Sequence, residues 1–192
     1  MSPTTHVLIT GASRGIGKGL VAAYLNSFNT TVVAAVRNIA SADSLRSLPK
    51  ASGSRLVVIN INVASADSIK RGITSMELEH KIDSLDVVLA NAGIAAVSPG
   101  LSEIDVGDIQ PFLNINAYGQ LELFKAVAPL LRRSSSGAPS KFMYIIVATD
   151  MAQIAFDSLK GKIDFDFAGQ AVSVEQSCQN ILEIVSAPLQ RI

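Results

Sequence analysis

The stretch "VLITGASRGIG", Val7 to Gly17, decides the fold of this 192-residue chain. It opens with a short run of aliphatic and β-branched residues, which predicts a buried strand. Three glycines follow at positions 11, 15 and 17, where the strand gives way to a segment of helical period. Glycines at such a junction allow a tight turn, a close approach of the backbone to a phosphate and close helix–strand packing. The amides at the helix start face the same place, so the stretch predicts a phosphate-binding loop.

The rest of the chain alternates short apolar runs with longer segments of helical period. This alternation is typical of a parallel sheet with helices on both faces. We therefore expect an α/β fold, a Rossmann-type doubly wound parallel sheet, in a single domain over residues 1–192. The expected strands are Val7–Thr10, Thr31–Val36, Arg55–Ile61, Asp86–Ala90 and Phe142–Val147.

Apolar stripes at helical spacing predict the helices between and after these strands. The stripes are Ile16–Leu20–Ala23, then Ile69–Ile73–Met76, then a long seam of Leu113, Ala117, Leu121, Phe124, Ala128 and Leu131, and last Val174, Cys178, Ile181 and Val185. Ser173 and Gln176 fit a capping box at the start of the last helix. Cys178 lies on the stripe of that helix, so we expect it to pack in the core and not to act as a catalytic thiol.

The composition argues against several classes of function. Sixteen basic residues balance sixteen acidic ones, so no net field attracts nucleic acid or an anionic membrane. The single cysteine suits a reducing compartment, and neither a signal peptide nor an apolar run of membrane-spanning length is visible. The two histidines have no partner at ligand spacing, so we expect no metal site. We expect a cytoplasmic protein without nucleic-acid or membrane partners.

Three motifs together resemble the short-chain dehydrogenase/reductase family, and the resemblance covers nearly the whole chain. "TGASRGIG" (10–17) is similar to the cofactor loop, "NAG" (91–93) to the motif that ends the fourth strand, and "NINAYG" (114–119) to the segment around the family's helix asparagine. Taken as a whole, the sequence resembles fungal ketoreductases of polyketide pathways. The resemblance implies a nicotinamide cofactor and a small-molecule carbonyl or alcohol substrate. It implies cofactor contacts from Gly11, Ser13, Arg14, Gly15, Ile16, Gly17, Asn91, Ala92 and Gly93, and leaves Asn116 as the surviving catalytic position.

Charge indicates which nicotinamide cofactor the chain binds. A carboxylate at the end of the second strand would hold the ribose 2′-hydroxyl of NAD. Here that strand is followed by Arg37, and Arg14 lies in the glycine loop. Two guanidinium groups near the ribose suit a 2′-phosphate through charge-assisted hydrogen bonds, so we expect NADP(H). The alternative is that both are ordinary surface arginines.

Two further positions are expected near the cofactor. Asn62 stands where the family commonly has an aspartate that contacts adenine, and a carboxamide can still hydrogen-bond the base edge. Lys125 follows Asn116 on the same helix. It either faces the cofactor or lies at the edge of the helix with its charge in water.

The catalytic pair of the family is missing from the sequence. The family's chemistry is general acid catalysis by a tyrosine, whose pKa is lowered by a lysine four residues later, with a serine on the fifth strand that orients the carbonyl. The three tyrosines of this chain are followed four places on by Phe28, Glu122 and Ala148. No Tyr-x-x-x-Lys is present.

The stretch "KFMYIIVATDMAQIAF", Lys141 to Phe156, suggests why the pair is missing. Its first half resembles the fifth strand of the family. "VATDM" resembles the turn after the sixth strand, in which Val147 and Thr149 hold the places that touch the nicotinamide amide. A strand–helix–strand unit needs roughly 30 residues, and the chain has no room for one between Ile145 and Val147. We expect a sheet truncated by loss of a helix and part of a strand; an alternative alignment puts Thr149 in place of the serine.

Two hypotheses about function follow. The first is an NADP(H)-dependent ketoreductase. The second is a catalytically inactive nucleotide-binding remnant, such as a pseudoenzyme or a mis-spliced product. In either case, loss of the helix would leave apolar surface exposed around Leu121 and puts a homo-oligomer in doubt, because the family's interface commonly uses that helix.

Overall fold

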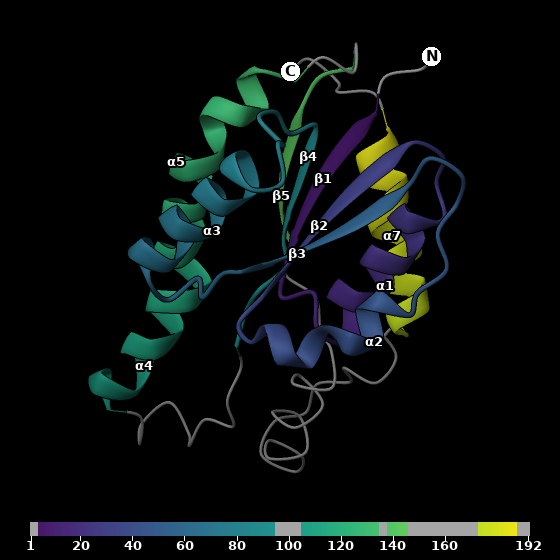
Figure 1. The fold of residues 1–192 in the computed structure, drawn as a ribbon. Coiled ribbons are helices and arrows are strands. Elements are labelled where there is room, and N and C mark those ends of the chain that lie inside the picture. Colours follow the sequence, from purple (N-terminus) through teal and green to yellow (C-terminus); the bar gives the residue numbers. More distant parts are fainter. Residues whose placement is uncertain (1–3, 95–104, 135–137, 146–172, 188–192) are drawn as a thin grey trace.

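The computed structural model describes residues 4–94, 105–134, 138–145 and 173–187. Within them, five strands form one sheet in the order β3-β2-β1-β4-β5, and all neighbouring strands are parallel (Figure 1). The strands are β1 (Thr5–Thr10), β2 (Thr30–Val36), β3 (Arg55–Asn60), β4 (Val87–Ala90) and β5 (Lys141–Tyr144). The predicted α/β fold is confirmed, and the first four strands end within two residues of their expected bounds. The expected end of the fifth strand, Val147, lies outside the described residues.

Helices cover both faces of this sheet (Figure 1). They are α1 (Gly15–Leu25), η1 (Ile39–Ala42), α2 (Asp43–Arg46), α3 (Ala66–Leu78), α4 (Val106–Leu113), η2 (Asn114–Tyr118), α5 (Gly119–Arg132) and α7 (Val174–Ser186). Of these, η1 is a 3-10 turn and η2 is a π-helical turn that joins α4 to α5. Helices α1 and α7 pack side by side on one face, while α3 and α5 cover the other. None of the helices described is long and apolar enough to cross a membrane.

The core is divided into two layers by the alternation of side chains along the strands. In β1, Val7 and Ile9 point to the layer under α1 and α7, and Leu8 points to the layer under α3 and α5. All seven residues of β2 are buried, as expected for a strand covered on both faces. Cys178 packs in the first layer, which agrees with the predicted core role.

The predicted seam lies largely on the outer side of α5, and the expected exposure of apolar surface around Leu121 is observed: Leu121 and Phe124 are exposed. The buried apolar side chains of α5 are instead Leu123, Val127 and Leu130, with Leu131 from the predicted seam. Helix α5 therefore carries two apolar stripes, and sequence spacing alone could not tell which one packs on the sheet. The π turn before it adds a residue to the helical turn and shifts the phase of any stripe that is counted across it.

The predicted capping box at the start of α7 is only partly formed, and three short helices were not predicted. Ser173 accepts a hydrogen bond from the Gln176 amide, as predicted, but the Gln176 side chain donates to Asn180 and does not complete the box. The short helices η1, α2 and α4 were not expected. Asp105 and Asp108 form the capping box that begins α4.

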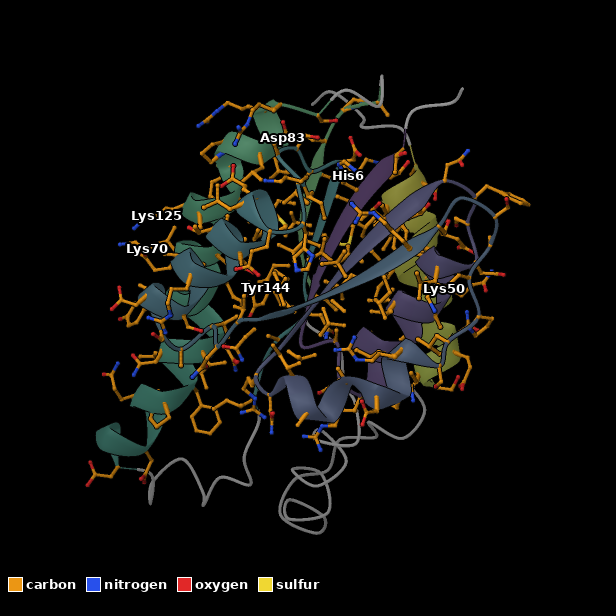
Figure 2. All side chains as sticks on the ribbon, in the orientation of Figure 1. His6, Lys50, Lys70, Asp83, Lys125 and Tyr144 are labelled. Carbon is orange, nitrogen blue, oxygen red and sulfur yellow. The ribbon has the colours of Figure 1, made fainter. Side chains whose placement is uncertain are left out.

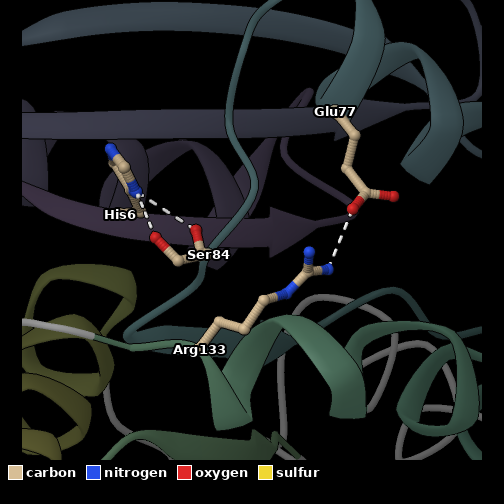
Figure 3. Close-up of polar contacts among 4 residues, drawn as sticks. All are labelled: His6, Glu77, Ser84 and Arg133. Atoms are coloured by element: carbon tan, nitrogen blue, oxygen red, sulfur yellow. Dashed lines mark hydrogen bonds and ion pairs between the residues drawn. The ribbon is translucent and has the colours of Figure 1, made fainter.

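Polar contacts fasten the amino-terminal edge of the sheet, away from the glycine loop (Figure 3). His6 Nδ1 lies 3.1 Å from the carbonyl oxygen of Ser84 and 3.3 Å from its Oγ. Arg133 Nη2 donates to Glu77 Oε1 over 2.9 Å and so joins the ends of α5 and α3. Both side chains of that ion pair are partly exposed, so its contribution to stability is below about 1 kcal/mol.

Candidate functional site

The glycine loop, residues 11–17, leads from the carboxyl end of β1 into α1. Gly11 and Gly15 have φ angles of +66° and +54°, in the left-handed region that glycine adopts more readily than residues with a side chain. Gly17 is required by packing, because a Cβ there would lie 2.3 Å from the carbonyl oxygen of Gly11. At Gly15 a Cβ would meet no atom of the described residues within 4 Å. The loop is thus closed on the protein side and open beside Gly15, as a phosphate cradle requires.

The first turn of α1 is free to bind an anion. Its N-cap residue, Arg14, makes no capping hydrogen bond with its side chain, and the first turn contains no acidic residue. The first amides of a helix have no partner within the helix, and the dipole places positive charge there. The amides beside Gly15 therefore suit the pyrophosphate of a dinucleotide.

The end of β4 is fastened to this loop by side chains. Thr10, buried at the end of β1, accepts hydrogen bonds from the amides of Asn91 and Ala92, both over 3.1 Å. Asn91 Nδ2 donates in return to the carbonyl oxygens of Thr10 (3.1 Å) and Gly11 (3.4 Å). The structure therefore brings the predicted "NAG" residues beside the glycine loop, and it gives the Asn91 side chain a structural task.

Asn116 lies in the π turn and binds the backbone of Ile94, in the loop that follows β4. Its Oδ1 accepts from the Ile94 amide over 3.0 Å, and its Nδ2 donates to the Ile94 carbonyl over 2.7 Å. Both polar groups of its side chain are thereby engaged by the backbone of one residue. The described contacts make Asn116 a positioning residue, and its catalytic role stays a prediction.

The predicted adenosine-side residues follow neighbouring strands at the same edge of the sheet. Arg37 comes directly after β2 and is exposed, as is Arg14. Among the described residues, neither arginine takes part in an ion pair. Asn62 follows β3, and its Oδ1 accepts from the Ala64 amide over 3.1 Å, which leaves Nδ2 as its donor for a ligand. Because β1, β2 and β3 are parallel neighbours, their carboxyl ends place these three side chains along one edge.

Comparison with known proteins identifies this arrangement. Residues 5–138 match the family described as short chain dehydrogenase. The chain belongs to the short-chain dehydrogenase family.

The most informative relatives of this short-chain dehydrogenase are fungal. It is 51% identical to the short chain dehydrogenase gsfK of Penicillium aethiopicum over 139 residues, which are 72% of this chain and 55% of the relative. It is 41% identical to the norsolorinic acid ketoreductase nor1 of Dothistroma septosporum over 145 residues, 75% of this chain and 54% of the relative. The expected resemblance to fungal ketoreductases is confirmed. The chain spans about half the length of these curated relatives.

Solved structures support the fold. An alcohol dehydrogenase from Thermococcus sibiricus, complexed with 5-hydroxy-NADP, superposes with a TM-score of 0.68 at 16% identity, covering 96% of this chain and 92% of that one. The NADPH-bound carbonyl reductase from chicken fatty liver has a TM-score of 0.65 at 27% identity, covering 94% and 71%. The glycine cradle and the uncapped start of α1 fit the nicotinamide cofactor that this family uses.

Not every predicted site residue is brought to this edge. Lys125 lies on the outer side of α5, where its ammonium group pairs with Glu122 Oε1 over 2.7 Å (Figure 2). This placement favours the second of its two expected roles, a charge held in water. Ser13 is half-buried in the glycine loop and Ile16 packs its side chain in the core. Val147 and Thr149 lie outside the described residues.

Tyr24 and Tyr144 have pKa values that are shifted away from those of an efficient general acid. Burial raises the pKa of Tyr24 to about 12 and raises the pKa of Tyr144 above its ordinary value. A general acid works best with a pKa near the operating pH, so both shifts go the wrong way. Within the described residues, no three His, Cys, Asp or Glu side chains gather at a spacing that could hold a metal ion.

Sequence reasoning missed two residues that shape the site. Gln120 is buried in α5, and its Nε2 donates to the carbonyl oxygens of Ala92 (2.8 Å) and Ile115 (3.0 Å), while its Oε1 has no partner among the described residues. Gly119 allows α5 to approach the loop after β3, because a Cβ there would lie 2.4 Å from the Val63 carbonyl oxygen. A glutamine on the buried stripe of a helix is the signal that could have drawn attention to Gln120.

Proposed function

We propose that this short-chain dehydrogenase binds NADP(H) across the carboxyl edge of its sheet, as the ketoreductases of its family do. One observation carries the proposal. A glycine cradle open at Gly15 lies at the uncapped start of α1, and the strand beside it ends in the exposed Arg37. Phosphate groups are recognised by this combination of free amides and guanidinium groups.

The residues that would hold each part of the cofactor follow from their strands. The amides beside Gly15 would bind the pyrophosphate, Arg14 and Arg37 the 2′-phosphate, and Asn62 Nδ2 the adenine edge. The loop after β4 would then border the nicotinamide half. When bound, NADPH supplies a hydride to a carbonyl carbon. The chain's own residues bind and orient the cofactor, and Asn91 and Asn116 keep the loop in place.

The 2′-phosphate assignment is tested by reversing the charge of Arg37. Arg37→Asp should weaken NADPH binding by roughly a hundredfold and leave NADH binding within about threefold, because an arginine–phosphate contact is charge-assisted and NADH lacks the phosphate. The measurement is a fluorescence titration of both nucleotides, with Arg132→Ala on the far end of α5 as the matched control. Equal loss of NADPH and NADH binding would contradict the assignment.

The substrate class is a proposal from the relatives. Three of them are named norsolorinic acid ketoreductases, so a ketone on an aromatic polyketide is the first carbonyl to test, as expected of fungal secondary metabolism. Reduction needs a proton donor beside the carbonyl oxygen, and the sequence has no Tyr-x-x-x-Lys to supply it.

That absence supports a second candidate, a nucleotide-binding protein without reductase activity. We infer an internal loss of the helix that carries the tyrosine and lysine, with the chain rejoined between Ile145 and Val147. Tyr144 is a poor substitute for the lost acid, because its hydroxyl donates to the Asn116 carbonyl, Ala148 stands where the lysine would be, and burial raises its pKa. The test is NADPH oxidation with a panel of aromatic ketones: cofactor binding without turnover supports this candidate, and turnover supports the ketoreductase. Sequencing the transcript across the codons for Ile145 and Ile146 would show whether a coding segment has been lost there.

A further inference from the structure

Tyr144 connects the edge strand of the sheet to the turn that carries Asn116. It ends β5 and pairs in register with Ala90, the last residue of β4. Its hydroxyl donates a hydrogen bond to the main-chain carbonyl oxygen of Asn116 over 2.6 Å. No motif of the sequence pointed to this contact, and the family resemblance assigned Tyr144 no role.

Packing directs the Tyr144 side chain toward the π turn. Alternation along β5 puts Phe142 and Tyr144 on the face covered by α5. Phe142 packs there edge-to-face with Phe124, with ring centroids 5.1 Å apart and planes at 80°. Tyr144, labelled in Figure 2, follows two residues later on the same side, and its hydroxyl reaches the backbone of the π turn at Asn116.

The carbonyl groups of the π turn can accept hydrogen bonds from outside the helix. The Gly119 amide donates to the Asn114 carbonyl, five residues back, which widens the helix at this point. A carbonyl oxygen has two lone pairs, so the Asn116 carbonyl can accept a side chain as well as a helical bond. Fixing this carbonyl also fixes the direction of the Asn116 side chain, which holds both backbone groups of Ile94.

We propose that Tyr144 is a positioning residue for the loop after β4, residues 91–94, acting through Asn116. The proposal rests on the proposed NADP(H) site. Arg37 and Asn62 place the adenosine half beside β2 and β3, and the pyrophosphate lies at α1. The other half of a dinucleotide must then extend across the switch between β1 and β4, toward the loop that Tyr144 holds.

The first experiment needs no ligand. Tyr144→Phe keeps the ring and removes the hydroxyl, and Tyr118→Phe removes an exposed hydroxyl on the same turn as a matched control. We expect exchange of the Ile94 amide proton, followed by NMR, to become roughly tenfold faster in Tyr144→Phe, the upper end of the effect of losing one intramolecular hydrogen bond. It should stay within about twofold in Tyr118→Phe. Unchanged Ile94 exchange in Tyr144→Phe would overturn the proposal.

The second experiment separates positioning from a general loss of structure. Tyr144→Phe should weaken NADPH binding by roughly three- to tenfold and leave binding of 2′,5′-ADP, the adenosine half alone, within about twofold. Unchanged NADPH affinity, or equal weakening of both ligands, would overturn the proposal. If the unmodified protein binds neither ligand, the proposed function fails, and the Ile94 exchange rate alone decides the role of Tyr144.

Discussion

The two sides of the carboxyl edge differ in what the chain supplies. On the side of β1, β2 and β3, the glycine loop, Arg37 and Asn62 follow the ends of the strands, and the side chains of β1 and β2 are largely buried. On the side of β5, the last described strand is four residues long, and the apolar side chains Leu121 and Phe124 lie exposed on α5. The catalytic tyrosine–lysine pair that the family needs on that side is missing from the sequence. The comparison shows that the residues proposed for cofactor binding stand apart from the place where the family has its proton donor.

The largest effect is expected at Gly17, where the glycine loop is most tightly packed. Gly17→Val would drive a side chain into the Gly11 carbonyl and the Asn91 side chain, neither of which can move without opening the loop. We expect a loss of about 3 kcal/mol or more in the free energy of unfolding and no measurable NADPH binding. Denaturant unfolding and a binding titration measure both.

Gly107 offers the control for that substitution. Among the described residues, no atom lies within 4 Å of a Cβ placed there, so Gly107→Ala in α4 should change stability by less than about 1 kcal/mol and leave binding unaltered. If Gly17→Val were as well tolerated as Gly107→Ala, the close packing described for the loop would be wrong.

The two apolar stripes of α5 provide the next comparison. Leu123→Ala should cost about 3 kcal/mol of unfolding free energy, because this side chain is fully buried. Leu121→Ala, two residues earlier on the exposed stripe, should cost less than about 1 kcal/mol. Urea unfolding of both variants decides the matter. Similar costs would show that Leu121 has a packing partner. They would contradict the description of this stripe of α5 as exposed.

A smaller loss is expected at the junction of β1 and β4. Thr10→Val removes the acceptor of two backbone amides, those of Asn91 and Ala92, and should cost about 2 kcal/mol. Thr31→Val is the control in β2: this threonine is equally buried but accepts from Arg55 Nε, whose exposed guanidinium can turn to water, so the loss should stay below about 1 kcal/mol. The measurement is thermal unfolding of both variants. A larger loss of stability in Thr31→Val than in Thr10→Val would contradict the description.

The smallest effect is expected at Lys125. Its ion pair with Glu122 is largely exposed, so Lys125→Ala should change stability by about 0.5 kcal/mol at most and leave NADPH affinity within about twofold. Lys18→Ala makes the same substitution in the first turns of α1, directly after the glycine loop, and its NADPH affinity provides the comparison. A loss of NADPH affinity of more than about fivefold in Lys125→Ala would return this residue to the cofactor site.

Much of the fold could be predicted because its signals are local. Buried parallel strands are continuous apolar runs, and the glycines that a tight strand–helix turn demands stand next to the strand they follow. The packed stripe of α5 could not be chosen, because both stripes are apolar and the choice depends on which one meets the sheet. Contacts such as Tyr144 to Asn116 join residues 28 positions apart, and no spacing rule predicts them.

The central claim is that the cofactor side of this short-chain dehydrogenase functions without the family's catalytic pair. It is tested most directly by titrating the unmodified protein with NADPH and with NADH at equilibrium. The account predicts saturable binding of NADPH at least tenfold tighter than that of NADH, since Arg37 and Arg14 would meet the extra phosphate. Binding of neither nucleotide, or tighter binding of NADH, would contradict it.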